Sequence, residues 1–263
     1  MFKDQVVWIT GASSGIGESM AVAWAKAGAK LVLSARRRDE LERVAKACGT
    51  SDILIHPLDL ASGSDFEADT RAVLSRFGRI DVVVHNGGIS QRSWVKDTAM
   101  DVHRRIMEVN YFGAIALTKA TLPTMLEAKR GHVVVISSVM GKIGTPLRSA
   151  YAASKHALHG YYDCLRAEVA DSNVNVTVIC PGFVSTNVSK NALTADGSPT
   201  NKTGDDIANG ISPDVAAAQI LNAVRAKKSE AYVGRIGKDR LALTLQRFAP
   251  GVLERLVRNQ VPK

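Results

Sequence analysis

Tyr151 and Lys155 stand four residues apart in the segment Tyr-Ala-Ala-Ser-Lys, a spacing that places a phenol and an ammonium on one helix face. A free tyrosine has a pKa of about 10 and is a weak acid or base at neutral pH. A neighbouring lysine cation favours the phenolate and lowers that pKa. Only Tyr151, of five tyrosines, has a lysine at this spacing. The pair is a candidate general acid/base, although an isolated Tyr–Lys pair is more often a solvated surface pair.

A glycine-rich turn near the N-terminus gives this pair a context. The apolar run 5–10 leads into Gly11-Ala-Ser-Ser-Gly15-Ile-Gly17, and a helical pattern follows at 18–27. A strand, a glycine turn and a helix start are typical of phosphate binding, because backbone N–H groups at the helix start face the anion. Gly11 permits the tight turn, Gly15 the approach of a pyrophosphate, and Gly17 close helix–strand packing. The pattern predicts a dinucleotide site, although a glycine turn without a ligand has the same local sequence.

Short Val-, Ile- and Leu-rich runs alternate with helical patterns along the whole chain. Strands are expected at residues 6–10, 30–35, 53–57, 81–85, 131–137, 175–180 and 230–233. Because these runs are continuously apolar, both faces of each strand are expected to be covered. Two long helices are expected, at 101–129 with a break near Pro123, and at 148–172. The pattern predicts one α/β domain, residues 1–263, with a doubly wound parallel sheet of about seven strands.

Further short motifs occur in the order and spacing of one protein family. They are Asp59-Leu60, Asn86-Gly87-Gly88, Asn110, Ser138 and Pro181-Gly182, each at or after an expected strand or inside a long helix. With the glycine turn and the Tyr–Lys pair, they resemble the short-chain dehydrogenase/reductase family over essentially the whole chain. The segments 97–168 and 193–198 look most like the branch of dehydrogenase/reductase member 7, including its B form. The resemblance implies a Rossmann-type fold and oxidoreductase chemistry on an alcohol/carbonyl pair.

The resemblance also implies a role for each member of a catalytic set, Asn110, Ser138, Tyr151 and Lys155. Tyr151 is expected to be the general acid in carbonyl reduction and the general base in alcohol oxidation. Ser138 is expected to hold the substrate oxygen and stabilise its developing negative charge. Lys155 is expected to bind the nicotinamide ribose as well as lower the pKa of Tyr151. Asn110 is expected to fix a water in a proton relay.

The implied cofactor is NADP(H), with NAD(H) as the alternative. Dinucleotide folds use an acidic residue after the second strand for the ribose 2′-hydroxyl, whereas a cation accommodates a 2′-phosphate. Here that strand runs into Arg36-Arg37-Arg38 with no carboxylate. Arg36 is the expected phosphate ligand and Arg37 the second choice, because an arginine fork matches a phosphate. The expected cofactor-binding residues are Gly11, Ser13, Ser14, Gly15, Ile16, Gly17, Arg36, Arg37, Asp59, Leu60, Asn86, Gly87, Gly88, Asn110, Tyr151, Lys155, Pro181, Gly182, Val184 and Thr186.

The segment 183–210 interrupts the regular pattern and is rich in Ser, Asn, Thr and Gly. It predicts a mobile substrate lid. The expected substrate-binding residues are Ser138, Met140, Tyr151 and Phe183. Apolar neighbours such as Ile143 and Leu193 favour an apolar substrate, and the resembled branch is associated with lipid-, steroid- or retinoid-like carbonyls. The two nearby cations, Arg148 and Lys142, are expected to point to solvent.

Length and composition fit one globular domain. A chain of 263 residues with 46% hydrophobic content can bury a two-sided sheet core. Cys48, Cys164 and Cys180 are scattered without a metal-ligand spacing, which fits a reducing compartment. The chain starts without a signal-peptide pattern and contains no run of 18 apolar residues. We therefore expect a cytoplasmic protein, although some animal members of the resembled branch carry a membrane anchor before this domain.

The net charge of +9 is concentrated near the C-terminus, where residues 225–263 hold ten Lys and Arg against three Asp and Glu. Within this region, 239–263 is a basic amphipathic segment that could lie on an anionic membrane surface. Its apolar side could equally cap the substrate cleft or a subunit interface, which is the favoured interpretation. An NADP-binding regulatory or membrane-surface protein is therefore the alternative function. Nucleic-acid binding has no motif behind it beyond charge.

Both long helices carry apolar residues beyond a single stripe, which predicts a partner for their outer faces. These residues include Ile115, Leu117, Leu122, Leu158, Tyr161, Tyr162 and Leu165. Two such helices pair across a two-fold axis in the resembled family. We expect a homodimer or a homotetramer built from it.

Two histidine features depart from the family pattern or suggest a different chemistry. His85 replaces an asparagine that helps tie the central sheet together, and it could donate one hydrogen bond in its place. His156 and His159 stand at i, i+3 on one helix, but no third ligand is evident. We therefore expect no metal at this pair.

Overall fold

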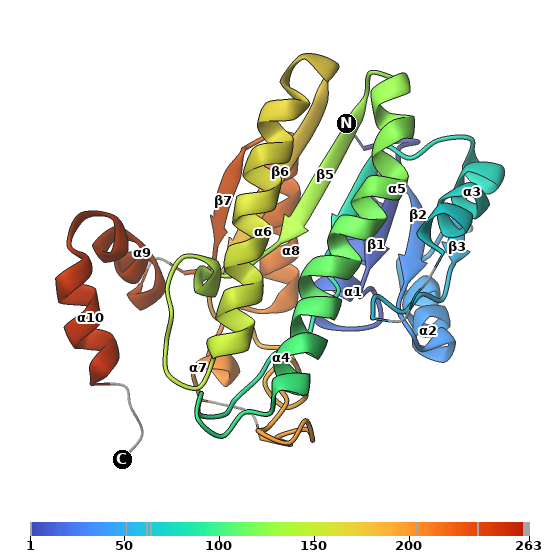
Figure 1. Cartoon of the computed structure of the whole chain (residues 1–263). Coiled ribbons are helices and arrows are strands. Elements are labelled where there is room, and N and C mark those ends of the chain that lie inside the picture. Colours follow the sequence, from blue (N-terminus) through green and yellow to red (C-terminus); the bar gives the residue numbers. More distant parts are fainter. Residues whose placement is uncertain are drawn as a thin grey trace.

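The carboxyl ends of seven parallel strands meet at one edge of a single sheet, and this edge carries the candidate site. The computed structural model describes residues 2–50, 52–61, 63, 65–202, 205–235 and 237–259, without the side chains of residues 205 and 206 (Figure 1). The strands are β1 (Val6–Thr10), β2 (Lys30–Ser34), β3 (Ile53–Ile55), β4 (Val82–His85), β5 (Gly131–Ile136), β6 (Val174–Pro181) and β7 (Glu230–Val233). Their order in the sheet is β3-β2-β1-β4-β5-β6-β7. This confirms the predicted doubly wound, Rossmann-type α/β fold.

The sheet changes its direction of growth between β1 and β4. Val7 pairs with Leu31 of β2 on one side and with Val82 of β4 on the other. Later strands then add outward from β4, while β2 and β3 lie beyond β1. In open parallel sheets, ligands bind beyond the carboxyl ends of the strands at such a switch point.

Helices cover both faces of the sheet, so the central strands are buried on both sides, whereas β3 and β7 at its edges are only partly buried. One face is covered by α1 (Gly15–Lys26), α2 (Arg38–Cys48) and α8 (Pro213–Arg225), and the other by α3 (Phe66–Phe77), α5 (Gly113–Glu127) and α6 (Ser149–Glu168) (Figure 1). Trp24, Leu41 and Ile220 belong to the first core, whereas Leu117 and Leu158 belong to the second. This two-sided burial is why the strand sequences are continuously apolar.

The break predicted near Pro123 is wrong, because Pro123 lies inside α5. Proline removes one helical hydrogen bond, but Pro123 is exposed, so water can satisfy the carbonyl that loses its partner. The long helical stretch is interrupted earlier instead. A helix α4 (Met100–Met107) passes into a π-helical turn at Glu108–Phe112 before α5 begins. That turn contains Asn110, one of the expected catalytic residues.

The basic C-terminal segment forms two helices rather than one. These are α9 (Lys238–Phe248) and α10 (Pro250–Arg258), and they stand together at one side of the domain (Figure 1). Pro250 begins the second helix, because proline fits the first helical turn, where its missing N–H needs no partner. The last part of the expected segment, residues 260–263, lies outside the described residues. Over the described ranges, no helix combines the length and the apolar character needed to cross a membrane.

His85 connects the end of β4 to the helical layer above it. Its Nε2 lies 2.7 Å from Thr118 Oγ1 on α5, and that hydroxyl lies 2.8 Å from the Tyr162 hydroxyl on α6. Thr118 also donates to the Ala114 carbonyl at 3.0 Å. A hydroxyl has one proton to donate, so Nε2–H of His85 is the donor to Thr118. His85 therefore makes one hydrogen bond in place of the usual asparagine, while its buried Nδ1 has no partner within the described residues.

Burial lowers the pKa of His85 to about 3. In the unfolded chain a histidine takes up a proton near its ordinary pKa of about 6.5, so stability is lost as the pH falls from there toward 3. We predict that His85→Asn, which cannot titrate, loses about 2 kcal/mol less unfolding free energy between pH 7 and pH 5 than the wild type. Urea denaturation at the two pH values measures this difference. The exposed His156→Asn on α6 is the control, and an equal loss in all three proteins would contradict the assignment.

Candidate active site

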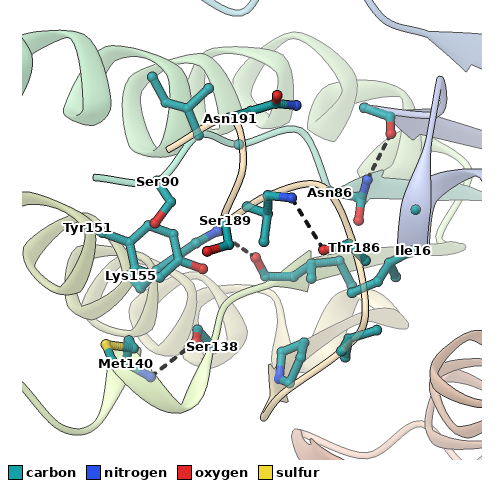
Figure 2. Close-up of a pocket in the computed structure, with 18 of the residues that line it drawn as sticks. Ile16, Asn86, Ser90, Ser138, Met140, Tyr151, Lys155, Thr186, Ser189 and Asn191 are labelled. Atoms are coloured by element: carbon teal, nitrogen blue, oxygen red, sulfur yellow. Dashed lines mark hydrogen bonds between the residues drawn. The ribbon is translucent and has the colours of Figure 1, made fainter. Parts of the chain in front are cut away.

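A cavity of about 1270 Å³ opens at the carboxyl ends of β1, β4, β5 and β6. Its wall contains every expected catalytic, cofactor-binding and substrate-binding residue except Gly17 and Asn110. Figure 2 shows Tyr151, Lys155 and Ser138 gathered on one side of the cavity and Ile16 and Asn86 on the other. The fold thus brings the glycine turn and the Tyr–Lys pair into one site.

The glycine turn after β1 needs glycine for both backbone conformation and space. Gly11 and Gly15 have φ angles of +64° and +58°, in the left-handed region that residues with a Cβ adopt at a cost. A Cβ on Gly11 would lie 2.7 Å from Cα of Gly87, in the turn after β4. Gly17 lies behind the cavity wall, where a Cβ would overlap the Gly11 carbonyl. Gly17 therefore packs α1 against the turn instead of facing a ligand.

The start of α1 can receive an anion. Ser14 stands at the N-cap in an extended conformation, and its side chain makes no capping hydrogen bond. The first N–H groups of the helix therefore remain available on the cavity side, with the positive end of the helix dipole. Ser13, Ser14, Gly15 and Ile16 all line the cavity. These features fit the pyrophosphate of a dinucleotide.

Asn86 and Thr10 fasten the ends of β1 and β4 to each other. The Asn86 amide donates to the carbonyls of Thr10 and Gly11 at 3.1 and 3.0 Å. The Thr10 hydroxyl accepts from the backbone N–H of Asn86 and of Gly87, both at 3.1 Å, and donates to Val84 at 3.2 Å. These bonds hold the two turns at the separation that the glycines allow.

The ends of β2 and β3 supply a cation and an acid at the far side of the cavity. Arg36 and Arg37 follow β2, and Asp59 and Leu60 follow β3. Arg37 lies 3.8 Å from Glu40, whereas Arg36 has no carboxylate within ion-pair distance in the described part of the chain. The guanidinium of Arg36 is therefore the available cation at this point.

Tyr151 is half-buried in the cavity wall, and two of its neighbours act on the phenol. Burial raises the pKa of Tyr151, while a hydrogen bond with Ser138 and the charge of Arg148 oppose that rise. The Ser138 hydroxyl also accepts from the Met140 N–H at 3.1 Å. Ser138 thus orients toward the place where a substrate oxygen would meet the tyrosine hydroxyl.

Lys155 does not contact the phenol in the way that the helix spacing predicts. Its ammonium donates to the Ile136 carbonyl at 2.8 Å and lies 5.7 Å from the centre of the Tyr151 ring. Burial lowers the pKa of Lys155 to about 8. The effects that oppose the rise in the tyrosine pKa come from Ser138 and Arg148, and the role expected of Lys155 toward the phenol stays a prediction.

Asn110 supports the cavity from behind, at 1% exposure. Its Oδ1 accepts from the Ile89 N–H at 2.8 Å, and its Nδ2 donates to the Ile89 carbonyl and to Ser154, both at 2.9 Å. The π-helical turn places the side chain where it can reach both segments. An amide oxygen can accept a second bond, so the expected role of Asn110 in holding a water stays a prediction.

The expected lid is anchored at its middle to the chain after β4. The Leu193 N–H donates to the Ser90 carbonyl and the Arg92 N–H to the Leu193 carbonyl, both at 2.8 Å. Leu193 is buried, and Val184 forms an isolated β-bridge with Ile211. Thr186 stands 3.1 Å from where a Cβ of Gly15 would lie. Residues 203 and 204 lie outside the described residues, and the mobility of the segment stays a prediction.

One side of the α9–α10 pair closes the cavity, in agreement with the favoured interpretation of this segment. Ala242, Leu253 and Val257 line the wall, and Leu253 is 6% exposed. Asp239 accepts from the Phe183 N–H at 3.1 Å, which ties α9 to the end of β6. The opposite side carries Phe248, which is 76% exposed.

Arg148 is not directed to solvent as expected. It is half-buried at the start of α6 and lines the cavity together with Arg92 and Arg105. No sequence motif contains either of the two other arginines, so sequence reasoning missed them. Lys142, in contrast, points away from the cavity and contacts Glu230 at 2.7 Å.

His159, which the sequence pairs with His156, instead belongs to a buried polar cluster. Its Nε2 lies 3.0 Å from Ser137 Oγ and 3.7 Å from Cys180 Sγ, while its Nδ1 lies 3.5 Å from Glu230. The two ring nitrogens face different partners, and the Lys142 ammonium already contacts the carboxylate. His159 thus hydrogen-bonds Ser137 just after β5 and contacts Cys180 of β6 and Glu230 of β7, an arrangement that sequence spacing could not reveal.

Together, these residues can bind a dinucleotide along the strand ends and transfer a proton at one end of it. Comparison with known proteins agrees. The family model of the short-chain dehydrogenases matches residues 5–197, and the chain belongs to that family. Its members are oxidoreductases, and a nicotinamide dinucleotide is their typical cofactor.

Individual relatives extend the likeness over nearly the whole chain. The chain is 42% identical to mouse dehydrogenase/reductase SDR family member 7B, over 99% of its own length and 82% of the relative. It is 46% identical to a dehydrogenase/reductase SDR family protein 7-like of Anopheles gambiae, over 98% and 84%. A crystal structure of a short-chain dehydrogenase from Streptomyces avermitilis superimposes with a TM-score of 0.82 at 29% identity, over 98% of this chain and 99% of that one.

Proposed function

We propose that this protein is an NADP-dependent oxidoreductase that interconverts an apolar alcohol and its carbonyl compound. The observation that carries the proposal is the position of Tyr151 and Ser138 in the same cavity as the glycine turn. A proton donor beside a dinucleotide site is the arrangement that carbonyl reduction requires. When bound, the dinucleotide supplies the hydride donor or acceptor.

The roles of the protein side chains follow from the charge that develops on the substrate oxygen. During reduction the carbonyl oxygen becomes negative, and the hydroxyls of Ser138 and Tyr151 can both donate to it. Tyr151 then transfers its proton, and its hydrogen bond with Ser138 and the charge of Arg148 oppose the rise that burial causes in its pKa. Lys155, with a pKa of about 8, is largely an ammonium at neutral pH and favours the resulting phenolate.

An apolar substrate is supported by the wall between Ser138 and the C-terminal helices. Met140, Ile143, Phe183, Leu193 and Leu253 all line this part of the cavity. Burial of each methylene contributes about 0.8 kcal/mol. Affinity should therefore rise with the size of the apolar part of the substrate, as for lipid-, steroid- or retinoid-like carbonyls.

We predict that kcat/KM for the NADPH-dependent reduction of straight-chain 2-ketones rises with chain length. Tyr151→Phe is expected to lower kcat/KM by about 10²–10⁴-fold. The phenylalanine ring fills the same space but has no proton to transfer. Absorbance at the NADPH band measures the rates, and fluorescence titration checks that the variant still binds NADPH. Tyr161→Phe, on the same helix but outside the cavity wall, is the matched control. Retention of more than about a tenth of the activity in Tyr151→Phe would exclude its assigned role.

Preference for NADP over NAD is supported by Arg36 at the end of β2, which forms no ion pair with the residues that the structure describes. We predict that Arg36→Gln weakens NADPH binding about tenfold or more, the scale of one charge-assisted hydrogen bond, and leaves NADH binding nearly unchanged. Isothermal titration with both cofactors measures the two affinities. Arg38→Gln, in which the removed cation faces Glu42 on α2, is the control. Equal weakening of both cofactors would assign Arg36 a structural role only.

We also propose a homodimer, or a tetramer built from it, through the outer faces of α5 and α6. Four of the apolar residues that suggested this interface lie in the core of the protomer itself, namely Leu117, Leu158, Tyr162 and Leu165. The remaining outward apolar surface is smaller, with Phe112 47% and Leu126 36% exposed, and Tyr161 half-buried. Phe112 is therefore the residue on which the interface most depends.

We predict a dimer or tetramer at micromolar concentration, and its conversion toward monomer by Phe112→Glu. A carboxylate placed in an apolar interface has no partner and is costly to desolvate. Light scattering during size-exclusion chromatography measures the mass. Phe248→Glu, at a more exposed phenylalanine of α9, is the control. A monomeric wild type would rule out the assembly.

A second candidate function rests on the exposed side of α9–α10. Leu241 and Phe248 are 56% and 76% exposed, next to Arg240 and Arg247. Such a surface suits an anionic membrane. A regulatory or membrane-surface protein of this kind would bind NADPH without oxidising it in the presence of any ketone, so the Tyr151→Phe comparison separates the two functions.

A further inference from the structure

The cavity is strongly positive. Its wall holds seven cationic side chains and two carboxylates. Arg36 and Arg37 stand at the far side, after β2, where the dinucleotide is expected. Arg92, Arg105 and Arg148 instead stand beyond the glycine turn, on the segments that surround the catalytic tyrosine. These three arginines are called the arginine triplet, and the expected cofactor site does not account for them.

Arg148 is held in a fixed position beside Tyr151. Its Nη1 donates to Ser90 Oγ at 2.9 Å and to the Gln91 carbonyl at 3.2 Å. The preceding Leu147 has a φ of +66°, a conformation that a leucine adopts only where its surroundings impose it. The Ser93 N–H donates to the Leu147 carbonyl at 3.2 Å and holds this turn. Nε and Nη2 of the guanidinium make no hydrogen bond to the described residues, so the fork can bind another group.

The electrostatic surroundings of Arg148 lack an anion. Burial and the charge of Arg92 both lower the pKa of Arg148, so its cation is disfavoured. Arg148 also occupies the N-cap of the 20-residue helix α6, where the helix dipole is positive and a cation is unfavourable. None of the three arginines has a carboxylate within ion-pair distance among the residues that the structure describes. A negative group placed here would relieve all of these penalties.

Arg105 completes the triplet from α4. Its neighbour Ile106 packs with Ala150 at the start of α6 and with Leu193 of the anchored segment. The same cluster contains Ile89, close to Arg92 in the chain. Each arginine therefore lies within three residues of a member of this cluster in the chain, and all three line the cavity. An apolar substrate in that wall would bring any charged end group toward them.

We propose that the substrate is an amphiphile, with an apolar body and a carboxylate or phosphate group that the arginine triplet binds. This proposal rests on the proposed function and narrows its substrate class. The guanidinium fork of an arginine matches both anions in geometry. Two such forks offer more N–H donors than a single carboxylate can pair with. The apolar body occupies the wall near Met140 and Leu253, and its carbonyl meets Tyr151 and Ser138. Small anions without the apolar part lack most of the binding surface.

The test compares matched ketones that differ only in charge. Twelve-carbon keto acids, with the ketone at several distances from the carboxylate, are assayed against their methyl esters with NADPH. A second pair, a hydroxyketone and its phosphate monoester, distinguishes phosphate from carboxylate. The expected kcat/KM ratio of anion to neutral partner is about tenfold or more for the best spacing in the wild type. A four- or five-carbon keto acid is expected to be a poor substrate.

Substitutions test whether the arginine triplet causes the preference for the anionic ketone over its neutral partner. Arg148→Gln and Arg92→Gln are each expected to move the anion-to-neutral ratio toward one, and Arg148→Lys to recover part of it. Arg104→Gln is the matched control, because Arg104 lies next to Arg105 but pairs with Asp101 outside the cavity wall. Arg92 is exposed, and its side chain makes no hydrogen bond or ion pair to the described residues, so Arg92→Gln keeps the test valid should Arg148→Gln fold poorly. NADPH titration verifies folding of each variant.

A binding measurement separates this proposal from the proposed function. Dodecanoate and dodecanol are compared for thermal stabilisation of the NADPH complex, without turnover. Stronger binding of dodecanoate that depends on Arg148 supports the proposal, even if no ketone is reduced. The proposal would be overturned if neutral ketones are reduced, the anion-to-neutral ratio of kcat/KM is near or below one, and no arginine variant changes that ratio. The oxidoreductase function would then remain intact.

Discussion

The structure depends most on the close approach of two backbone turns, one after β1 and one after β4. A Cβ on Gly11 would lie 2.7 Å from the Gly87 backbone, so only glycine lets the turns meet. Thr10 and Asn86 then fasten them with shared hydrogen bonds. Because these turns set the separation of β1 and β4 at the switch point, they decide where a ligand can lie against the sheet. The catalytic side of the cavity is built outward from this fixed point, through Asn110 and α6.

Charge is the second constraint on the site. Burial raises the pKa of Tyr151 and lowers the pKa of Lys155, so it favours the neutral form of each side chain. The cations around them have few carboxylates to pair with. A cavity of this kind is unfavourable by itself and becomes favourable when phosphates or a developing oxyanion occupy it, because a low-dielectric wall strengthens each interaction. The protein therefore gives up local electrostatic stability at the site to gain binding there.

Most of the fold and much of the site can be predicted from the sequence, because they follow local rules. Most of the seven strands are short runs rich in Val, Ile and Leu, and the glycine turn and the Tyr–Lys spacing mark two groups of residues that the fold brings into one cavity. The failures occur where tertiary contacts override those rules. Pro123 remains helical because its exposed position tolerates a missing hydrogen bond, and the π-helical turn at Asn110 has no sequence signature. His159 contacts residues of β6 and β7 and one just after β5, and no spacing along the chain could reveal these contacts.

Arg148 shows why such failures carry functional information. Local rules disfavour a cation at a helix N-cap and a leucine with positive φ just before it. Both occur together beside Tyr151, the proposed general acid, on a helix whose other features are regular. Sequences generally satisfy local preferences, and the exceptions concentrate where a ligand supplies the missing interaction. The placement of Arg148 is therefore more informative about the substrate than the apolar wall, because apolar residues serve packing and binding alike, whereas an unpaired guanidinium in a cavity serves packing poorly.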